Sequence, residues 1–277
     1  MKNCLLSELF IIIILFTFYS DISFSQWKSD EEVFENVFKN NIFKFITSQH
    51  SNLKFYFQKD SYSFGNSNKL IEQTLNALDS NSRLLNTKVT DTMDVVFLNT
   101  TEQMKILTGS KAKGWALPSY NCILIVVNDT TRPYLKHELM HLVSVKALGP
   151  SEKTSFWINE GLSVYAEENC MEHSLDELCA FFLHKNYFLN IDTLQNNFWD
   201  YPDMLTYMES GFIVQYLVTT YGIDKFKKLW NDGYSAFNTI YGFSLIELEE
   251  RIRGYVLELH PTCPVIDWDM LLVKGCG

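Results

Sequence analysis

The sequence predicts an α+β fold in which a small sheet packs against helices. Three short apolar segments with the pattern of β-strands lie in the first half of the chain, at residues 53–57, 93–98 and 122–127. A helical pattern begins at Leu135, and the segments after it also have helical patterns. Strands followed by a run of helices are typical of an α+β arrangement.

The apolar residues of the remaining segments recur every three or four positions, which indicates amphipathic helices. Helices are expected at residues 27–50, 71–86, 101–107, 135–148, 157–168, 175–186, 204–221, 223–232 and 245–259. Pro118 precedes the third strand and suggests an edge or entry position for it. We expect one domain over 26–277, with a sheet-containing lobe at about 50–130, a helical lobe at about 131–260 and an irregular tail at 261–277.

Composition limits the class of protein. The chain has 277 residues, 47% of them hydrophobic, which is enough for the core of one large domain or two small lobes. The formal net charge is −10, which argues against nucleic acid or an anionic membrane surface as a partner.

The N-terminal segment predicts export. The run from Leu9 to Tyr19 is almost purely apolar, and Lys2 precedes it. Ser23 and Ser25 provide small residues before a cleavage site, so residues 1–25 are expected to be a signal peptide. The run is short for a membrane span, which needs about 20 residues, so no stable span is expected after cleavage. An uncleaved anchor is the alternative.

The segment around His137 carries the chemistry. His137, Glu138 and His141 form the pattern His-Glu-x-x-His within a predicted helix. Residues four apart lie about 40° apart around a helix axis, so both imidazoles can face one metal ion. Glu138 lies close enough to act on a water molecule without being a ligand. This pattern is the signature of zinc hydrolases; two hydrogen-bonded histidines in a buried helix are the structural alternative.

A catalytic zinc takes three protein ligands and keeps one position open. Glu160 lies on the next predicted helix, 19 positions after His141, within Trp-Ile-Asn-Glu-Gly. The intervening loop allows this helix to fold back antiparallel to the first. Glu160 is therefore the predicted third ligand, and a solvated surface carboxylate is the alternative.

These motifs together resemble the gluzincin metallopeptidases, the clan of thermolysin and the zinc aminopeptidases. His-Glu-x-x-His, eighteen residues and then Glu within Trp-x-x-Glu-Gly is similar to the aminopeptidase-type branch and to small exported peptidase MA-like proteins. The resemblance covers roughly residues 50–230. It implies a thermolysin-like zincin fold, one zinc per chain and a peptide or protein substrate, with residues 122–127 in the place of the edge strand that binds extended substrate.

The resemblance also implies a role for Tyr207. Aminopeptidase-like gluzincins have a tyrosine at the start of the corresponding helix, and its hydroxyl faces the reacting oxygen of the substrate. Tyr201 is the second candidate. In the implied mechanism Glu138 takes a proton from the attacking water, whose pKa the zinc lowers, and delivers it to the leaving amine.

Two family features are absent from the sequence. Aminopeptidases bind the free amino group of the substrate through a glutamate in Gly-x-Met-Glu-Asn, whereas residues 114–118 read Gly-Trp-Ala-Leu-Pro. Val164 replaces the aspartate that orients a ligand histidine in thermolysin, so another group must orient the ring. Endopeptidase and exopeptidase action both stay open.

After removal of residues 1–25, five cysteines are left. Sequence proximity suggests Cys170–Cys179 and Cys263–Cys276, with Cys122 as a buried thiol, although sequence alone does not fix connectivity. The leading interpretation of the chain is an exported zinc metallopeptidase. A catalytically silent relative that binds peptides or a partner protein is the alternative, and Glu138 argues against it.

Overall fold

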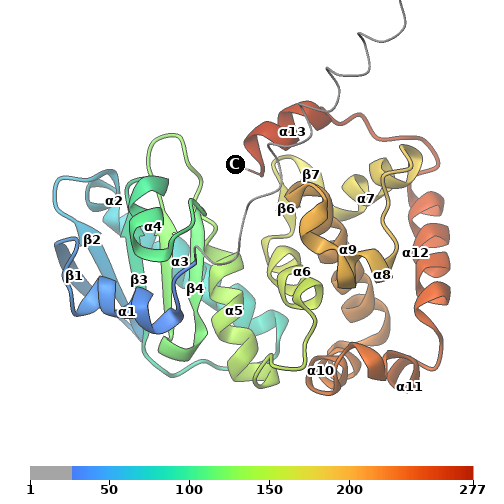
Figure 1. The fold of residues 1–277 in the computed structure, drawn as a ribbon, viewed down its shortest axis with the longest axis horizontal. Coiled ribbons are helices and arrows are strands. Elements are labelled where there is room, and N and C mark those ends of the chain that lie inside the picture. Colours follow the sequence, from blue (N-terminus) through green and yellow to red (C-terminus); the bar gives the residue numbers. More distant parts are fainter. Residues whose placement is uncertain (1–26, 277) are drawn as a thin grey trace, which may run out of the picture.

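The computed structural model describes residues 27–276 and has the predicted α+β composition, with a mixed sheet followed by helices (Figure 1). The strand order of the five-stranded sheet is β1-β2-β3-β5-β4. β1 is antiparallel to β2, β3 is parallel to both β2 and β5, and β4 is antiparallel to β5. The strands are β1 (Phe45–His50), β2 (Leu53–Gln58), β3 (Met93–Leu98), β4 (Gly114–Leu117) and β5 (Cys122–Val126).

The alternation of side chains along the strands divides the core of this lobe into two layers. Phe55, Val95 and Ile123 face one layer, which also contains α3 (Ser67–Leu84) and α5 (Leu135–Leu148). Tyr56, Val96 and Leu124 face the other layer, which contains α1 (Asp30–Phe38) and α4 (Thr101–Thr108). Helices therefore cover both faces of the sheet, and α5 lies between the sheet and the helical lobe (Figure 1).

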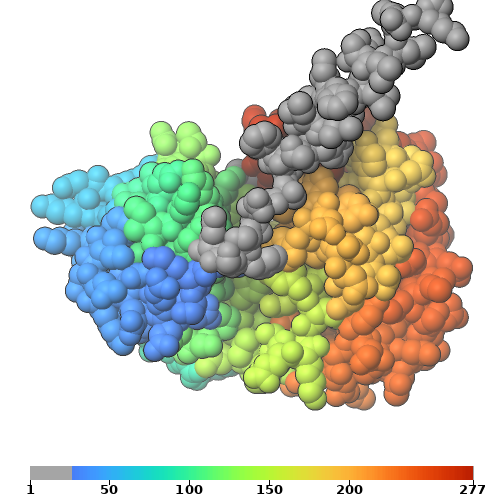
Figure 2. All heavy atoms as spheres, in the orientation of Figure 1, coloured from blue at the N-terminus to red at the C-terminus, as the bar shows by residue number. Residues whose placement is uncertain are grey.

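Helices make up most of the chain after α5. They are α6 (Phe156–Glu167), α7 (Leu175–His184), α8 (Ile191–Asn196), α9 (Asp203–Tyr221), α10 (Ile223–Asp232), α11 (Phe237–Tyr241), α12 (Leu245–Leu259) and α13 (Trp268–Lys274). A short hairpin of β6 (Asn169–Cys170) and β7 (His173–Ser174) follows α6. Single-turn elements are α2 (Tyr62–Gly65), η2 (Pro118–Tyr120), η3 (Phe198–Asp200) and η4 (Tyr234–Ala236). The space-filling view shows the helical lobe packed against the sheet lobe (Figure 2).

Glycine allows α6 and α9 to approach closely. A Cβ added to Gly161 on α6 would lie 2.5 Å from the carbonyl oxygen of Ser210 on α9. The backbones of α6 and α9 are thus in contact at the residue after Glu160. This contact fixes the position of the Glu160 side chain relative to the helical lobe.

Several predicted boundaries were wrong. The predicted helix over 27–50 ends at Phe38, because Asn41 adopts a left-handed conformation with φ of 48° and the chain then enters β1. The three-to-four-residue spacing of apolar residues continues through Phe45 and Ile46, so the sequence pattern extended the predicted helix past its end. The helix expected at 71–86 begins earlier, at Ser67, and the single-turn α2 precedes it.

The predicted edge strand was also assigned wrongly. β5 is buried at all five positions and lies between β3 and β4, so β4 forms the edge of the sheet. A continuous apolar run is typical of an interior strand. Pro118 begins the η2 turn, which ends β4 rather than starting β5.

The disulfide bond is Cys170–Cys276, so both predicted pairs were wrong. The predicted irregular tail contains α13, whose Trp268 packs against Phe181 and Phe182 of α7. This packing brings position 276 to the β6–β7 hairpin, far from its neighbours in sequence. Cys122 is a buried free thiol as predicted, Cys179 is also buried and free, and Cys263 is exposed.

Among residues 27–276, no helix is long and apolar enough to cross a membrane. The predicted signal peptide at residues 1–25 lies outside the described residues and stays a prediction.

A buried carboxyl on α9 predicts a pH-dependent stability. Glu209 is fully buried, and its Oε2 accepts a 3.1 Å hydrogen bond from the backbone N–H of Leu189. Burial raises the pKa of Glu209 well above its ordinary value, so the folded state holds a proton that the unfolded chain releases above a pKa of about 4.3. Folding stability is therefore lost as pH rises above this value, by at most about 1.4 kcal/mol per pH unit up to the folded-state pKa.

We expect Glu209→Gln to remove this loss. The variant should melt at a higher temperature than the wild type at pH 7 and at a similar temperature at pH 4, measured with a chelator present so that metal release does not contribute. The exposed Glu250 on α12 provides the control, because Glu250→Gln should not change the pH profile. Parallel melting profiles for wild type and Glu209→Gln would contradict the assignment.

Candidate metal centre

α5 carries the two histidines. His137 and His141 are one turn apart, and their ring centroids are separated by 5.0 Å. The opposite side of the helix is fixed in the core by buried Leu139, Leu142 and Val143. The side-chain amide of Asn81 on α3 donates a 2.7 Å hydrogen bond to the carbonyl of Lys136. These contacts hold α5 so that both imidazoles point toward α6.

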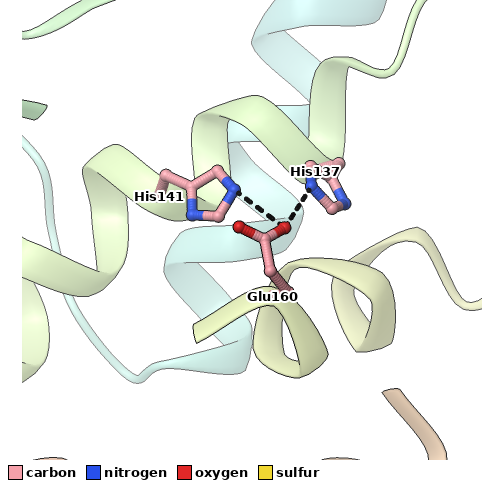
Figure 3. Close-up of side chains that lie close together, drawn as sticks. All are labelled: His137, His141 and Glu160. Atoms are coloured by element: carbon pink, nitrogen blue, oxygen red, sulfur yellow. Dashed lines mark ion pairs between the residues drawn. The ribbon is translucent and has the colours of Figure 1, made fainter. Parts of the chain in front are cut away.

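Glu160 projects from α6 between the two imidazoles (Figure 3). Its Oε2 lies 3.3 Å from Nε2 of His137 and 3.7 Å from Nε2 of His141. The three side chains each offer one ligand atom, and these atoms lie within 4.8 Å of one another. A tetrahedral zinc with bonds of about 2.0–2.2 Å separates its ligand atoms by roughly 3.3 Å. The donor set and its spacing therefore fit a metal ion.

Two polar groups on α6 orient His141. Its Nδ1 lies 3.2 Å from Oδ1 of Asn159 and 3.2 Å from Oγ of Ser163. An Nδ1–H that donates to these oxygens leaves the lone pair of Nε2 free for a metal. These residues supply the ring-orienting contact that the sequence left unassigned. Asn159 and Ser163 are four positions apart and therefore lie on the same side of α6. This spacing beside Glu160 is the feature of the sequence that could have identified them as ring-orienting residues.

Glu167 joins the ends of α5 and α6. Its Oε1 accepts a 3.0 Å hydrogen bond from the backbone N–H of His137. Its Oε2 lies 3.2 Å from Nη2 of Arg132. The first N–H groups of a helix have no partner within the helix, so this carboxylate fixes the backbone at the first metal-site residue.

Glu138 lies under the edge strand. Its side chain is buried, and a Cβ added to Gly114 of β4 would overlap its carboxyl group. Glycine is thus the residue that leaves room for this carboxyl group beside the edge strand. Glu138 is not among the three ligand atoms that meet between α5 and α6.

Charges in the site are strongly coupled. Burial raises the pKa of Glu138 to about 7. Burial opposes protonation of His137, but its hydrogen bond to Glu160 and the nearby carboxylates raise its pKa to about 9. Burial lowers the pKa of His141, and the two histidines hold the pKa of Glu160 below its ordinary value despite burial.

Tyr207 lies on α9 beside the histidines. Its ring centroid is 6.4 Å from that of His137 and 5.2 Å from that of Phe198. Burial raises the pKa of its phenol well above the ordinary value, so the hydroxyl keeps its proton. Tyr201 is exposed and precedes α9. Tyr207 therefore lies beside a metal-site residue, and its catalytic role stays a prediction.

A family model described as the Peptidase MA superfamily matches residues 74–258, which is more than half of the chain. The chain belongs to the Peptidase MA superfamily. The range matched by the Peptidase MA model contains His137, Glu138, His141, Glu160 and Tyr207. No curated protein and no solved structure matches the chain.

Two of the other histidines, His184 and His260, lie in contacts outside the metal centre. His260 lies 2.6 Å from a carboxylate oxygen of Asp176, and His184 is hydrogen-bonded to the carbonyl of His260. These two histidines join α7 to the end of α12, and the metal centre uses neither.

Proposed function

We propose that this Peptidase MA protein is a zinc-dependent peptidase. The observation that carries the proposal is the meeting of three metal-ligand atoms beside a buried carboxyl group, Glu138, that is not one of them. A binding or structural metal site has no need for such a group. Structural zinc sites close the fourth position with Cys or His, whereas the group found in the described residues contains three ligands.

His137, His141 and Glu160 would hold the zinc ion. Two imidazole nitrogens and one carboxylate oxygen form the ligand set of catalytic zinc sites in peptidases. When bound, zinc supplies a lowered pKa for water in its open position and polarises a carbonyl group. Asn159 and Ser163 would keep His141 in the tautomer that binds the metal.

Glu138 acts as the general base and then as the general acid. Its carboxylate takes a proton from the attacking water and passes it to the nitrogen of the leaving amine. Gly114 keeps the space over this carboxyl group clear. Tyr207, which retains its proton, donates a hydrogen bond to the oxyanion that develops on the substrate carbonyl.

The edge strand β4 would bind the substrate. β4 lies at the edge of the sheet, and its first residue, Gly114, is next to Glu138. A peptide can add to such an edge as a further strand through main-chain hydrogen bonds. This arrangement brings a backbone carbonyl to the metal centre whatever the side chains of the peptide are.

We also propose that the protein acts outside the cytoplasm. The predicted signal peptide at residues 1–25 and the Cys170–Cys276 disulfide both support export, because disulfides persist in oxidising compartments.

The proposed function is tested on a mixed peptide pool. Protein loaded with one equivalent of zinc should cleave peptides from the pool, with products identified by mass spectrometry. A chelator should stop cleavage and added zinc should restore it. A pool that the zinc-loaded protein leaves intact would instead favour a silent, peptide-binding domain.

A further inference from the structure

The segment that follows α13 lies against the elements that build the metal centre. We call residues 274–276, which are the last residue of α13 and the two residues after it, the strap. The Cys170–Cys276 disulfide fixes the strap to the hairpin that follows α6. In Figure 1 the end of α13 lies over the boundary between the sheet lobe and the helical lobe.

On the sheet side, the strap contacts two residues next to the site. The ammonium group of Lys113 donates a 3.3 Å hydrogen bond to the carbonyl of Lys274. The hydroxyl of Tyr134 is hydrogen-bonded to the backbone of Cys276. Lys113 directly precedes Gly114, and Tyr134 is the N-cap residue of the helix that carries His137.

On the helical side, the strap contacts α9 beside the predicted catalytic tyrosine. The Sγ of Cys276 lies 4.0 Å from Sδ of Met204 and 3.8 Å from Sδ of Met208. These methionines flank Tyr207 in the sequence. The strap therefore joins the sheet lobe to the helical lobe at one end of the metal centre.

The position of the strap limits how a peptide can extend along β4. The backbone N–H of Val126 donates to the carbonyl of Lys113, so these two residues form a hydrogen-bonded pair of the antiparallel ladder. Because such pairs alternate, the backbone groups of Gly114 and Ala116 point away from β5, to the side of β4 on which no strand of residues 27–276 pairs. In one direction a peptide paired with these residues reaches Leu117 and the η2 turn. In the other direction it passes Gly114 and meets Lys113, Tyr134 and the strap.

We propose that the strap blocks one end of the peptide path along β4, so that the protein accepts only a short extension of the peptide on one side of the scissile bond. The proposal rests on the proposed binding of peptides along β4. It assigns the substrate class as peptides cleaved near one of their ends, and it assigns the disulfide the role of holding this barrier in place.

Phosphinic peptides test the proposal without requiring cleavage. A phosphinate that replaces one peptide bond binds the metal and fixes the register of the probe. The probe is lengthened by one to six residues, separately on its N-terminal and C-terminal sides, and binding to the zinc-loaded wild type is measured by fluorescence anisotropy. We expect lengthening beyond two residues to weaken binding about tenfold on one side only, which corresponds to about 1.4 kcal/mol.

Opening the strap should remove this asymmetry. The double variant Cys170→Ser/Cys276→Ser and a chain that ends at Val273 should bind the two length series within about threefold of each other. Cys263→Ser is the matched control, since Cys263 is an exposed free thiol, and it should keep the wild-type asymmetry. Variants are preferable to a reducing agent because thiol reductants also bind zinc.

The outcomes separate the two proposals. Equal length dependence on both sides of the wild-type probe would overturn the strap proposal, whether or not the variants fold. The same asymmetry in folded strap variants would also overturn it. Asymmetric binding without cleavage of any peptide would retain the strap proposal and reject the peptidase assignment, and the absence of binding by every probe would reject both.

Discussion

Glu138→Gln is expected to reduce peptide hydrolysis by about 10²- to 10⁴-fold while the protein keeps its metal. The amide has nearly the shape of the carboxyl group and fits beside Gly114, but it does not accept a proton from water. Glu138 is not one of the three ligand atoms, so metal content should not change. The rate is measured on the peptide that the wild type cleaves best, and metal content is measured by elemental analysis.

A second carboxylate near α5 and α6 provides the control. Glu168 pairs with Lys136 at 3.1 Å, and its side chain is 63% exposed. Glu168→Gln removes the same charge close to the site without entering it, and its activity should stay within about twofold of wild type, since exposed ion pairs contribute little. Unchanged hydrolysis by Glu138→Gln would refute its role as the general base.

The grouping of His137, His141 and Glu160 could be predicted because helical geometry relates the two histidines to each other. His137 and His141 lie on one face of any helix that contains them, and the apolar pattern around Leu139 and Val143 identified that helix. Glu160 required one further assumption, that the next helix folds back. The strands at 93–98 and 122–127 were equally clear, because β-branched and aromatic residues are concentrated in them.

Features that depend on contacts between distant segments could not be predicted. β4 has only four residues, and nothing in Gly-Trp-Ala-Leu identifies an edge strand until Gly114 is placed against Glu138. The Cys170–Cys276 bond depends on the packing of α13 against α7, which has no short-range signal. Ser163 is an unremarkable helix residue in the sequence and becomes a ring-orienting group only beside His141.

The combined variant His141→Ala/Glu160→Ala is expected to lose the metal. Wild type should contain one zinc per chain by elemental analysis, and the variant close to none, because a single imidazole from His137 holds zinc too weakly to survive dialysis. The reason is the number of ligands: catalytic zinc sites have three protein ligands, and each lost ligand must be replaced by water. Hydrolysis should be lost together with the metal.

Glu138→Gln is the matched control for this experiment, because it changes a carboxyl group on the same helix that is not among the ligand atoms. The two variants should separate the site into a metal-holding part and a proton-transferring part: one loses zinc and activity, and the other loses activity alone.

Thermal melting is measured for both, since Glu160 and His141 are packed between α5 and α6 and a variant that fails to fold would lose zinc for another reason. Full zinc content in a folded His141→Ala/Glu160→Ala protein would show that the metal is bound elsewhere. The convergence of three donor atoms between α5 and α6 would then be a buried hydrogen-bonded cluster, the structural alternative that the His-Glu-x-x-His pattern left open.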